Sequence, residues 1–475
     1  MNYDFDIAVI GGGAAGLFAA SVANFLGAKT CILEKDKLGG ECTWTGCIPS
    51  KALIRSAHLA HLFKRSSKLG IKFAGKTSLS TDKVISHVHD IVKEISLHHT
   101  PETLERRGIK ILFGSPRFKD ERTIESNGKS LKAKRYIICT GTRPAIPPIE
   151  GLKDIDYLTN ENIFSLDNIP SDLIILGGGP IGIELAQAIR RLGSKVTVVE
   201  MLDRILPQED EDIVSIVESE LKYEGVNMLT GKKAVKIEKI ADRISLTLTD
   251  EDGKTENISS NDILIATGRK PNVENLSLEK ASVEYTKKGI CTNMYLQTTN
   301  GNIFACGDVV GPYMFSHVAA YQAGICARNA LFRKIAWQRT DYRNIAWATF
   351  TTPEIAHLGL TEKEARSDFR KINIYKTDYD NSDRAVTDLH KNGRIKVLTD
   401  NKGRILGAHI AGAGASEIMH GFLIAKSLKI GLSKLASLVF IYPTLSELVK
   451  KTAAKSLKEK AGNSFIRFFL RVLRS

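Results

Sequence analysis

The sequence predicts an α/β protein in which one pattern of strand, glycine-rich turn and helix occurs twice, followed by an α+β unit. Short apolar runs end in clusters of glycine near residues 11 and 177, and each cluster leads into an amphipathic helix and a second apolar strand. Alternating apolar and polar residues after about Tyr342, with a turn at 401–403, indicate an antiparallel sheet. At roughly 150 residues per domain, the 475 residues correspond to about three domains.

The composition is that of a soluble globular protein, with 43% hydrophobic and 25% charged residues. Seven cysteines are too few to staple the fold, and no uncharged apolar run reaches the roughly 18 residues that a transmembrane helix needs. The first residues carry acids where a signal peptide carries Lys or Arg, so we expect a cytoplasmic protein. The net charge of +14 leaves open a nucleic acid, a membrane surface or an acidic partner.

The basic charge is concentrated at the C-terminus. From Leu448 to Ser475 there are eight Lys or Arg residues and one acid. The net charge of this segment is therefore +7, half of the +14 of the whole chain. A basic tail therefore explains the charge better than a basic groove, and no nucleic-acid partner is expected. In residues 464–475, arginines at i, i+4 and i+7 alternate with apolar residues, which predicts an amphipathic helix on an anionic membrane surface. Docking of this helix on the protein is the alternative.

Both glycine clusters have the spacing G-x-G-x-x-G between a strand and a helix. Such glycines allow a tight turn and the close approach of a pyrophosphate, to which the helix N-terminus offers backbone N–H groups. In both copies an acid ends the next strand, 23 positions after the first glycine, at Glu34 and Glu200, where it can bind a ribose hydroxyl. Two such sites predict two dinucleotides, for which a flavin and a nicotinamide are the natural pair. The clusters are Gly11, Gly13 and Gly16, and Gly177, Gly179 and Gly182.

Two cysteines, Cys42 and Cys47, lie between the first of these acids and the next predicted helix. Gly46 gives the backbone room to bring them together, and the Pro-Ser that follows suits a helix start, whose dipole favours a thiolate. No further ligands lie near by in sequence, so we expect a redox-active dithiol and no metal site. The histidine pairs at 87/89 and 98/99 do not share a helix face either. The remaining thiols are expected to be buried and inert: Cys31, Cys139, Cys291, Cys306 and Cys326.

These motifs, in this order, resemble the class I pyridine nucleotide–disulfide oxidoreductases, which include dihydrolipoamide dehydrogenase, glutathione reductase and mercuric reductase. The resemblance rests on GGxCxxxGCIPSK ending at Lys51, both glycine fingerprints, the related segments IICTGTRP and ILIATGRKP, a Cys-Gly-Asp ending at Asp308 and a late Tyr-Pro-Thr-x-x-Glu. It implies two Rossmann-like dinucleotide-binding domains and an α+β dimerisation domain, and hence a homodimer. The implied boundaries are 1–149 and 270–341 for FAD binding, 150–269 for NAD binding, 342–455 for dimerisation and 456–475 for a basic amphipathic tail.

The resemblance also implies which residues hold the cofactors. Asp308 would bind the ribityl chain or pyrophosphate of FAD, and His317 would either donate to the flavin pyrimidine or only pack near it. Glu200 repels a 2′-phosphate, which favours NAD(H) over NADP(H), although Arg204 keeps NADP(H) open as an alternative. The implied FAD residues are Gly11, Gly13, Gly16, Glu34, Gly141, Asp308 and His317. The implied NAD(H) residues are Gly177, Gly179, Gly182, Glu200 and Gly268.

The implied mechanism passes two electrons between nicotinamide, flavin and the cysteine pair. Cys47 would lie against the flavin as a thiolate, and Cys42 would exchange with the acceptor. Lys51 would favour negative charge on the reduced flavin, with Glu184 holding it in place. An ordinary ion pair between Lys51 and Glu184 is the alternative.

The late motif departs from the pattern of the thiol-reducing members, because Tyr442 stands where they have histidine. A tyrosine with a pKa near 10 cannot accept a proton at pH 7 as imidazole can, which puts efficient dihydrolipoamide or glutathione turnover in doubt. By the resemblance, Tyr442 and Glu447 reach the active site of the partner subunit; packing at the dimer seam is the alternative for Tyr442. Mercuric reductases also have tyrosine there, but they carry a C-terminal cysteine pair, and no cysteine follows Cys326 here.

The sequence therefore predicts a homodimeric, FAD-dependent and NAD(H)-linked oxidoreductase that passes electrons through Cys42 and Cys47 to an unidentified small-molecule or disulfide acceptor. It is closest in active-site pattern to a mercuric reductase without the C-terminal cysteine pair. One alternative is a dihydrolipoamide dehydrogenase or a mercuric or other metal reductase. Another, of a different class, is a redox-sensing flavoprotein attached to the inner membrane surface through residues 464–475.

Overall fold

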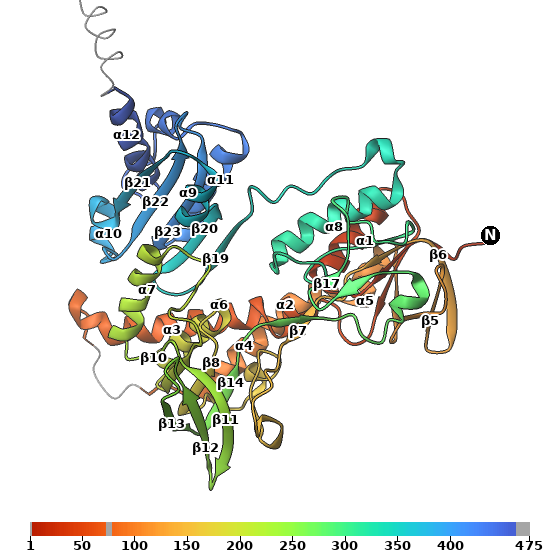
Figure 1. The fold of residues 1–475 in the computed structure, drawn as a ribbon, viewed down its shortest axis with the longest axis horizontal. Helices are drawn as coiled ribbons and strands as arrows, with labels where there is room; N and C mark the ends of the chain where they lie inside the picture. The colour runs from red at the N-terminus through yellow and green to blue at the C-terminus, as the bar shows by residue number, and fades with distance from the viewer. Residues whose placement is uncertain (1, 73–77, 462–475) are drawn as a thin grey trace, which may run out of the picture.

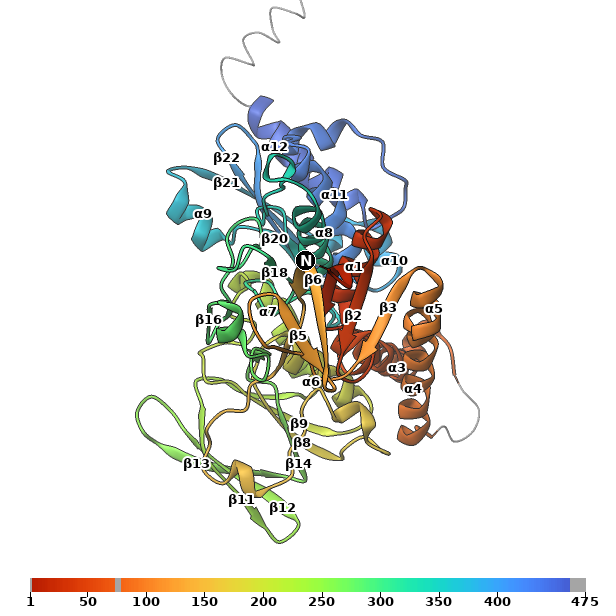
Figure 2. The same ribbon diagram turned by 90° about the vertical axis from the view of Figure 1, so that its right-hand side faces the viewer.

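The computed structural model describes residues 2–72 and 78–461, and these form three units that Figure 1 separates clearly. The first unit contains the N-terminal strands and, late in the chain, helix α8. The second unit, in yellow and green, lies below, and the third, in blue, contains the C-terminal sheet. Figure 2 shows the same units from the side of the first sheet.

The first unit is built on a mainly parallel sheet of order β3-β2-β1-β6-β5-β4, with β18 beside β6. Because helices cover it, the central strands bury near-continuous apolar runs, and Ile7, Val9 and Ile32 are fully buried. Helices α1 and α8 pack against each other on this sheet. Its bounds are β1 Phe5–Ile10, β2 Thr30–Glu34, β3 Ile109–Phe113, β4 Arg117–Phe118, β5 Thr123–Ser126, β6 Lys129–Ile138, β18 Ile303–Ala305, α1 Ala14–Phe25 and α8 Ser316–Leu331.

Between β2 and β3 the chain forms helices that connect the first unit with the second. Helix α3 packs against α4 and against α6 of the second unit, so the segment that carries the cysteine pair is wedged between both. The helices are α2 Gly40–Trp44, α3 Cys47–Arg65, α4 Thr81–Ser96 and α5 Pro101–Arg106.

The second unit repeats the strand, turn and helix of the first on the parallel sheet β10-β9-β8-β14. A three-stranded antiparallel sheet, β11-β12-β13, adjoins it, and short strands β7 and β15 pair where the chain crosses between the units. The bounds are β7 Thr142–Pro144, β8 Asp172–Leu176, α6 Pro180–Arg191, β9 Lys195–Val199, α7 Glu211–Tyr223, β10 Asn227–Leu229, β11 Lys233–Ile240, β12 Arg243–Thr249, β13 Thr255–Ser260, β14 Asp262–Ile265 and β15 Arg269–Pro271. The short strands β16 Tyr285–Thr286 and β17 Gly289–Ile290 lie with the first unit, where Ile290 packs in the same core as Ala8 and Ile10.

The third unit is an antiparallel sheet of order β19-β20-β23-β22-β21 packed against helices. The predicted turn at 401–403 joins β22 to β23, and this prediction is confirmed. The bounds are β19 Ala346–Thr349, β20 Glu354–Gly359, α9 Glu362–Asp368, β21 Ile372–Asp378, α10 Asp383–Thr387, β22 Arg394–Asp400, β23 Ile405–Gly412, α11 Ala415–Ser427 and α12 Glu447–Ala461.

The predicted α/β class, with two Rossmann-like units and one α+β unit, is confirmed. The predicted start of the tail at residue 456 falls inside α12, which continues to Ala461 because Thr452, Ala453 and Ser456 still pack into the third unit. The predicted amphipathic helix at 464–475 lies outside the described residues, so membrane contact stays a prediction. Within the ranges 2–72 and 78–461, no helix combines the length and hydropathy needed to cross a bilayer.

Candidate functional site

One large cavity of about 3330 Å³ lies where the three units meet. Both glycine clusters, both following acids and the cysteine pair border the same space, although they come from separate parts of the sequence. Gly16 and Gly182 do not line it, since they lie where each helix packs on its turn. Tyr442 and Glu447 also lie outside it. The predicted residues that line the cavity are Gly11, Gly13, Glu34, Cys42, Cys47, Lys51, Gly141, Gly177, Gly179, Glu184, Glu200, Gly268, Asp308 and His317.

The two glycine turns have the same geometry, which fits two dinucleotides. Gly11 and Gly177 have φ of +100° and +113°. A Cβ on Gly11 would lie 2.5 Å from the Cys139 carbonyl oxygen, and one on Gly177 would clash with the carbonyl oxygen of Ala266, so both positions need glycine. The N-caps of α1 and α6 are glycines without a side-chain cap, which leaves the first backbone N–H groups of both helices to a phosphate.

The acid after each turn is held in the same way. Oε2 of Glu34 accepts a hydrogen bond of 2.6 Å from the Gly12 N–H, and Oε2 of Glu200 accepts one of 2.6 Å from the Gly178 N–H. The second oxygen of each carboxylate accepts a backbone N–H two residues later, at 2.8 and 2.9 Å. Each carboxylate oxygen has a further lone pair, so both acids can also accept from ribose hydroxyls at the cavity wall.

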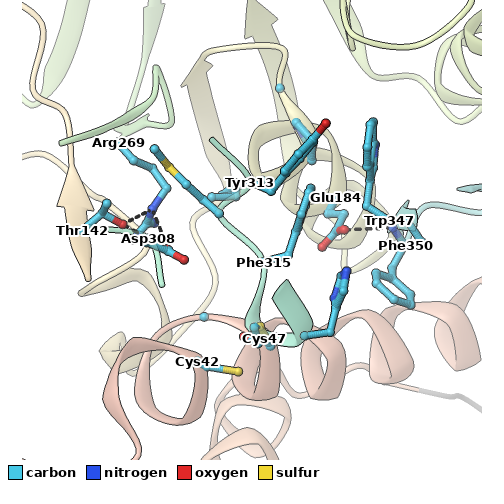
Figure 3. A pocket seen from close by; sticks show the side chains of 18 of the residues that line it. Cys42, Cys47, Thr142, Glu184, Arg269, Asp308, Tyr313, Phe315, Trp347 and Phe350 are labelled. Carbon is cyan, nitrogen blue, oxygen red and sulfur yellow. Dashed lines mark hydrogen bonds and ion pairs between the residues drawn. The ribbon is translucent and has the colours of Figure 1, made fainter. Parts of the chain in front are cut away.

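The cysteine pair is positioned by two short helices in series. Cys42 lies in α2, and Cys47 is the first residue of α3, as Figure 3 shows. Gly46 lies at the junction of the two helices. A larger residue would not fit there, because its Cβ would lie 2.9 Å from the Glu41 carbonyl oxygen. Both thiols are free in this structure, and Sγ of Cys47 lies 3.5 Å from Oγ of Ser316, at the start of α8.

The two thiols differ strongly in acidity. A hydrogen bond from the Cys42 thiol, together with Ser316 and the positive charge of Lys51, lowers the pKa of Cys47 to about 6. The same hydrogen bond and burial raise the pKa of Cys42. At neutral pH the reduced pair therefore holds one proton, on Cys42, and Cys47 is a thiolate that faces the cavity.

Lys51 and Glu184 meet beside the cysteine pair, although 133 positions separate them. Nζ of Lys51 lies 2.8 Å from Oε2 of Glu184, and the other oxygen of Glu184 accepts the backbone N–H of Phe350 at 2.8 Å. The Phe350 ring lies under the ammonium group, with Nζ 4.5 Å from its centroid. One carboxylate thus connects α3, α6 and the third unit, and the contacts to Phe350 were not foreseen from the sequence.

Asp308 was predicted, but the contacts that surround it were not. Thr142 donates to Oδ2 of Asp308 at 3.2 Å, Nε of Arg269 lies 4.0 Å from the same oxygen, and burial raises the pKa of Asp308. Arg269 donates to both oxygens of Glu41, with Nη1 at 2.6 Å from Oε1, and so holds α2 beside the first sheet. The sequence feature that could have pointed to Arg269 is its position directly after Gly268, in the segment ILIATGRKP that repeats IICTGTRP.

The third unit fixes the orientation of His317. Its Nε2 lies 2.8 Å from the Ala346 carbonyl oxygen, and its ring stacks on Phe315 at 5.5 Å between centroids. Phe315 stacks in turn on Trp347, which forms an aromatic wall of the cavity (Figure 3). The sequence did not predict this aromatic wall, because Phe315 belongs to the first unit and Trp347 to the third.

Tyr442 is exposed, with 66% of its surface accessible, and lies on a segment whose apolar side chains Val439 and Ile441 are also exposed. Its hydroxyl donates to Oδ2 of Asp383 at 3.0 Å, which raises the pKa of Tyr442. Glu447 begins α12, and its Oε2 is buried without a hydrogen-bond partner among the described residues. Within one chain, neither residue reaches the cysteine pair.

The prediction that the other thiols are buried is confirmed for four of the five cysteines. Cys31, Cys139, Cys306 and Cys326 are buried, and the sulfur atoms of Cys139 and Cys306 lie 3.5 Å apart at the ends of adjacent strands. The prediction is wrong for Cys291, which is only half-buried because it follows the short edge strand β17 rather than a strand of a central sheet.

Known proteins are similar to this chain in sequence and fold. Residues 5–324 match the family model described as pyridine nucleotide-disulphide oxidoreductase, and residues 345–453 match the model of its dimerisation domain. A mercuric reductase of Bacillus cereus is 33% identical over 451 residues, which cover 94% of this chain and 71% of that protein. A dihydrolipoyl dehydrogenase of Bacillus subtilis (strain 168) is 31% identical over 458 residues, covering 95% and 98%.

A solved structure is also similar. It is the Cu(II) complex of the HOCl-induced flavoprotein disulfide reductase RclA from Escherichia coli, with a TM-score of 0.83 and 25% sequence identity. The similarity covers 96% of this chain and 99% of that one.

The acidity of Cys47 can be measured directly. In the reduced protein we expect the rate of Cys47 alkylation by iodoacetamide to rise with a midpoint near pH 6. Ser316→Ala removes a hydrogen bond to the thiolate, which raises this pKa and lowers the rate at pH 6 by about two- to threefold. Ser50→Ala is the control, because Ser50 donates only to the Cys47 carbonyl oxygen. A midpoint near the ordinary value of about 8.5 in the parent protein would refute the assignment.

Proposed function

This chain belongs to the pyridine nucleotide–disulfide oxidoreductases, and we propose that it carries two electrons from NADH, through FAD and the Cys42–Cys47 pair, to an acceptor. The observation that carries this proposal is a cysteine pair that lines the same cavity as two glycine turns, with the pKa of Cys47 lowered. The family uses FAD and a pyridine nucleotide, and the match to its dimerisation domain indicates a homodimer.

The first cradle would hold FAD, with Glu34 on a ribose and Asp308 near the ribityl chain. Bound there, FAD supplies hydride acceptance from the nicotinamide and two-electron transfer to the disulfide. The residues of this chain would orient the cofactor and provide the charges around the cysteine pair. Glu184 holds the Lys51 ammonium beside Cys47, where its positive charge stabilises the thiolate.

The proposed reductive half-reaction balances without an added base. The hydride of NADH brings two electrons and one proton, which break the Cys42–Cys47 S–S bond. The electrons leave both sulfurs reduced, the proton remains on Cys42, and Cys47 stays a thiolate, in keeping with the acidities of the two groups. The products are NAD⁺, one thiol and one thiolate.

For the acceptor we propose a thiophilic or redox-active metal ion, Cu(II) or Hg(II), as the substrate. Two Cu(II) ions, taken in turn, or one Hg(II) ion would accept the two electrons; the S–S bond re-forms and the Cys42 proton is released. Two observations support this choice: Tyr442 donates to Asp383 rather than being free to accept a proton, and relatives include mercuric reductases and a flavoprotein disulfide reductase solved with Cu(II).

For the nucleotide we propose NAD(H). The Glu200 carboxylate stands where a 2′-phosphate would lie. Arg204, the residue that could neutralise this charge, is already engaged: its Nη1 and Nη2 donate to the carbonyl oxygens of Glu209 and Pro207, both at 2.8 Å.

Anaerobic titration with NADH tests the dithiol pathway. In the FAD-loaded protein we expect a long-wavelength absorbance band, which arises from a thiolate beside the flavin. Cys42→Ser should show this band without NADH, and the band should disappear as the pH falls below about 6. Cys47→Ser should lose the band while NADH still bleaches the flavin. Bleaching of the parent protein with no such band would exclude the pathway.

The nucleotide preference is tested by steady-state kinetics with both cofactors. We expect kcat/KM for NADH to exceed that for NADPH at least about tenfold, which is about 1.4 kcal/mol. Glu200→Ala should reduce the ratio of the two kcat/KM values, mainly by lowering kcat/KM for NADH. The ribose of NADH loses its hydrogen-bond acceptor, and the glycine turn loses the carboxylate that holds the Gly178 N–H. Asp203→Ala, an exposed acid on the same loop, should leave the ratio unchanged. An equal preference in the parent protein would contradict the assignment.

The acceptor is tested with NADH and a panel of Cu(II), Hg(II), lipoamide and glutathione disulfide. We expect the parent protein to turn over the metal ions faster than either disulfide. Tyr442→His should raise lipoamide reduction by at least about tenfold, since general-base catalysis contributes about 10²–10⁴-fold and the free oxygen of Glu447 can orient the imidazole. Lipoamide turnover that equals metal reduction and survives Tyr442→Phe would contradict a metal acceptor while leaving the dithiol pathway intact.

A further inference from the structure

Away from the cysteine pair, a buried cluster of two histidines and an acid joins the second and third units. His357 on β20 and His409 on β23 are direct cross-strand partners, and Glu209 approaches them from the loop before α7. Their exposed fractions are 1%, 0% and 4%. One nitrogen or oxygen atom from each of the three lies within 4.8 Å of the other two.

The hydrogen bonds of the two rings define where their protons are. Nε2 of His357 lies 2.8 Å from the Gly359 carbonyl oxygen, and Nε2 of His409 lies 2.9 Å from that of Leu360. A carbonyl oxygen only accepts, so each Nε2 carries a proton, and in a neutral ring the other nitrogen, Nδ1, carries a lone pair. Nδ1 of His409 has no hydrogen-bond partner among the described residues.

Nδ1 of His357 faces an acceptor. It lies 2.7 Å from Oε2 of Glu209. A lone pair and a carboxylate oxygen repel each other at this distance, so the pair either shares a proton or opens by about 0.6 Å to bind a metal ion at a tetrahedral angle. A proton on His357 would satisfy this pair but would leave the buried Nδ1 of His409 without a partner, which is costly.

A metal ion satisfies all three groups together. Imidazoles that donate their other N–H to a backbone carbonyl are oriented as metal ligands usually are. Two imidazole nitrogens and one carboxylate are a donor set that Zn²⁺ accepts, with the fourth position open to water. We propose that Glu209, His357 and His409 bind one Zn²⁺ ion at the junction of the second and third units.

The surroundings fit this assignment. Glu209 and His357 line the large cavity, which gives an ion a path of entry. The second oxygen of Glu209 accepts the indole N–H of Trp347 at 2.7 Å, and the Trp347 ring stacks on His357 with 3.7 Å between centroids. The ion would therefore fix one member of the aromatic wall, and would do so independently of the cysteine pair.

A second group of similar composition serves as a control. His61, Glu220 and Glu224 also approach within 4.8 Å of one another. There the charge is already neutralised, because both oxygens of Glu224 accept from Arg191, at 2.6 and 2.7 Å, and Arg65 lies near Glu220. This group has the composition of a metal site but no need for a cation.

The experiment uses the FAD-loaded full chain with Cys42→Ser and Cys47→Ser, so that the reactive thiols do not bind metal. After treatment with a chelator, the protein is titrated with Zn²⁺, and bound metal and Tm are measured. We expect one equivalent of Zn²⁺ and a rise in Tm of at least about 2 °C. His357→Phe keeps a ring against Trp347, and Glu209→Gln keeps the size of the side chain; each should abolish both effects, whereas His61→Gln should preserve them.

Two results would overturn the proposal. The first is the absence of Zn²⁺ binding in the chelator-treated protein whose cysteine pair is replaced. The second is an unchanged stoichiometry and Tm rise in Glu209→Gln, the variant that alters the least volume, whatever the folding of His357→Phe. In either case the cation between Glu209 and His357 is a proton.

Discussion

The carboxylate of Glu184 lies where the three units meet, and the geometry of the site depends on it. Its two oxygens bind Lys51 of α3 and the Phe350 N–H of the third unit, while its own backbone belongs to α6. Because the Glu184 carboxylate is buried, loss of either partner would leave its charge less well compensated, which is costly. The first turn of α3, and with it Cys47, is therefore fixed relative to both dinucleotide cradles.

The same solution for binding a dinucleotide occurs twice, but the chain takes a different course after each copy. In both copies, the carboxylate after the second strand accepts one backbone N–H of the glycine turn and one from two residues beyond the acid itself, so the acid and the turn are parts of one structure. After the first copy the chain turns into α2 and presents a dithiol. After the second it turns toward the third unit, where Glu209 contacts Trp347 and His357. Only the first copy thus leads directly into the cysteine pair.

The sequence predicted those features whose cause is local. Glycine spacing, the acid at 23 positions and the apolar runs are determined within one strand–turn–helix segment, and the fold they predicted is confirmed. Contacts that cross between units could not be predicted in this way, because Ser316 lies 269 positions from Cys47 and Arg269 lies 228 from Glu41. The buried histidines were missed for the same reason, since their lone pairs converge only after β20 and β23 pair.

The protons at the dithiol constrain what it can reduce. A disulfide substrate requires Cys42, whose pKa is raised, to lose its proton and the leaving thiolate to gain one in each turnover, so a group that titrates near neutral pH must lie close by. Tyr442 holds its proton more firmly than an ordinary tyrosine, because its hydroxyl donates to Asp383. A metal ion takes up electrons without a proton, and its binding to sulfur itself displaces the proton of a thiol. Under the proposed function, tyrosine in place of histidine therefore favours a metal ion over a disulfide as the acceptor.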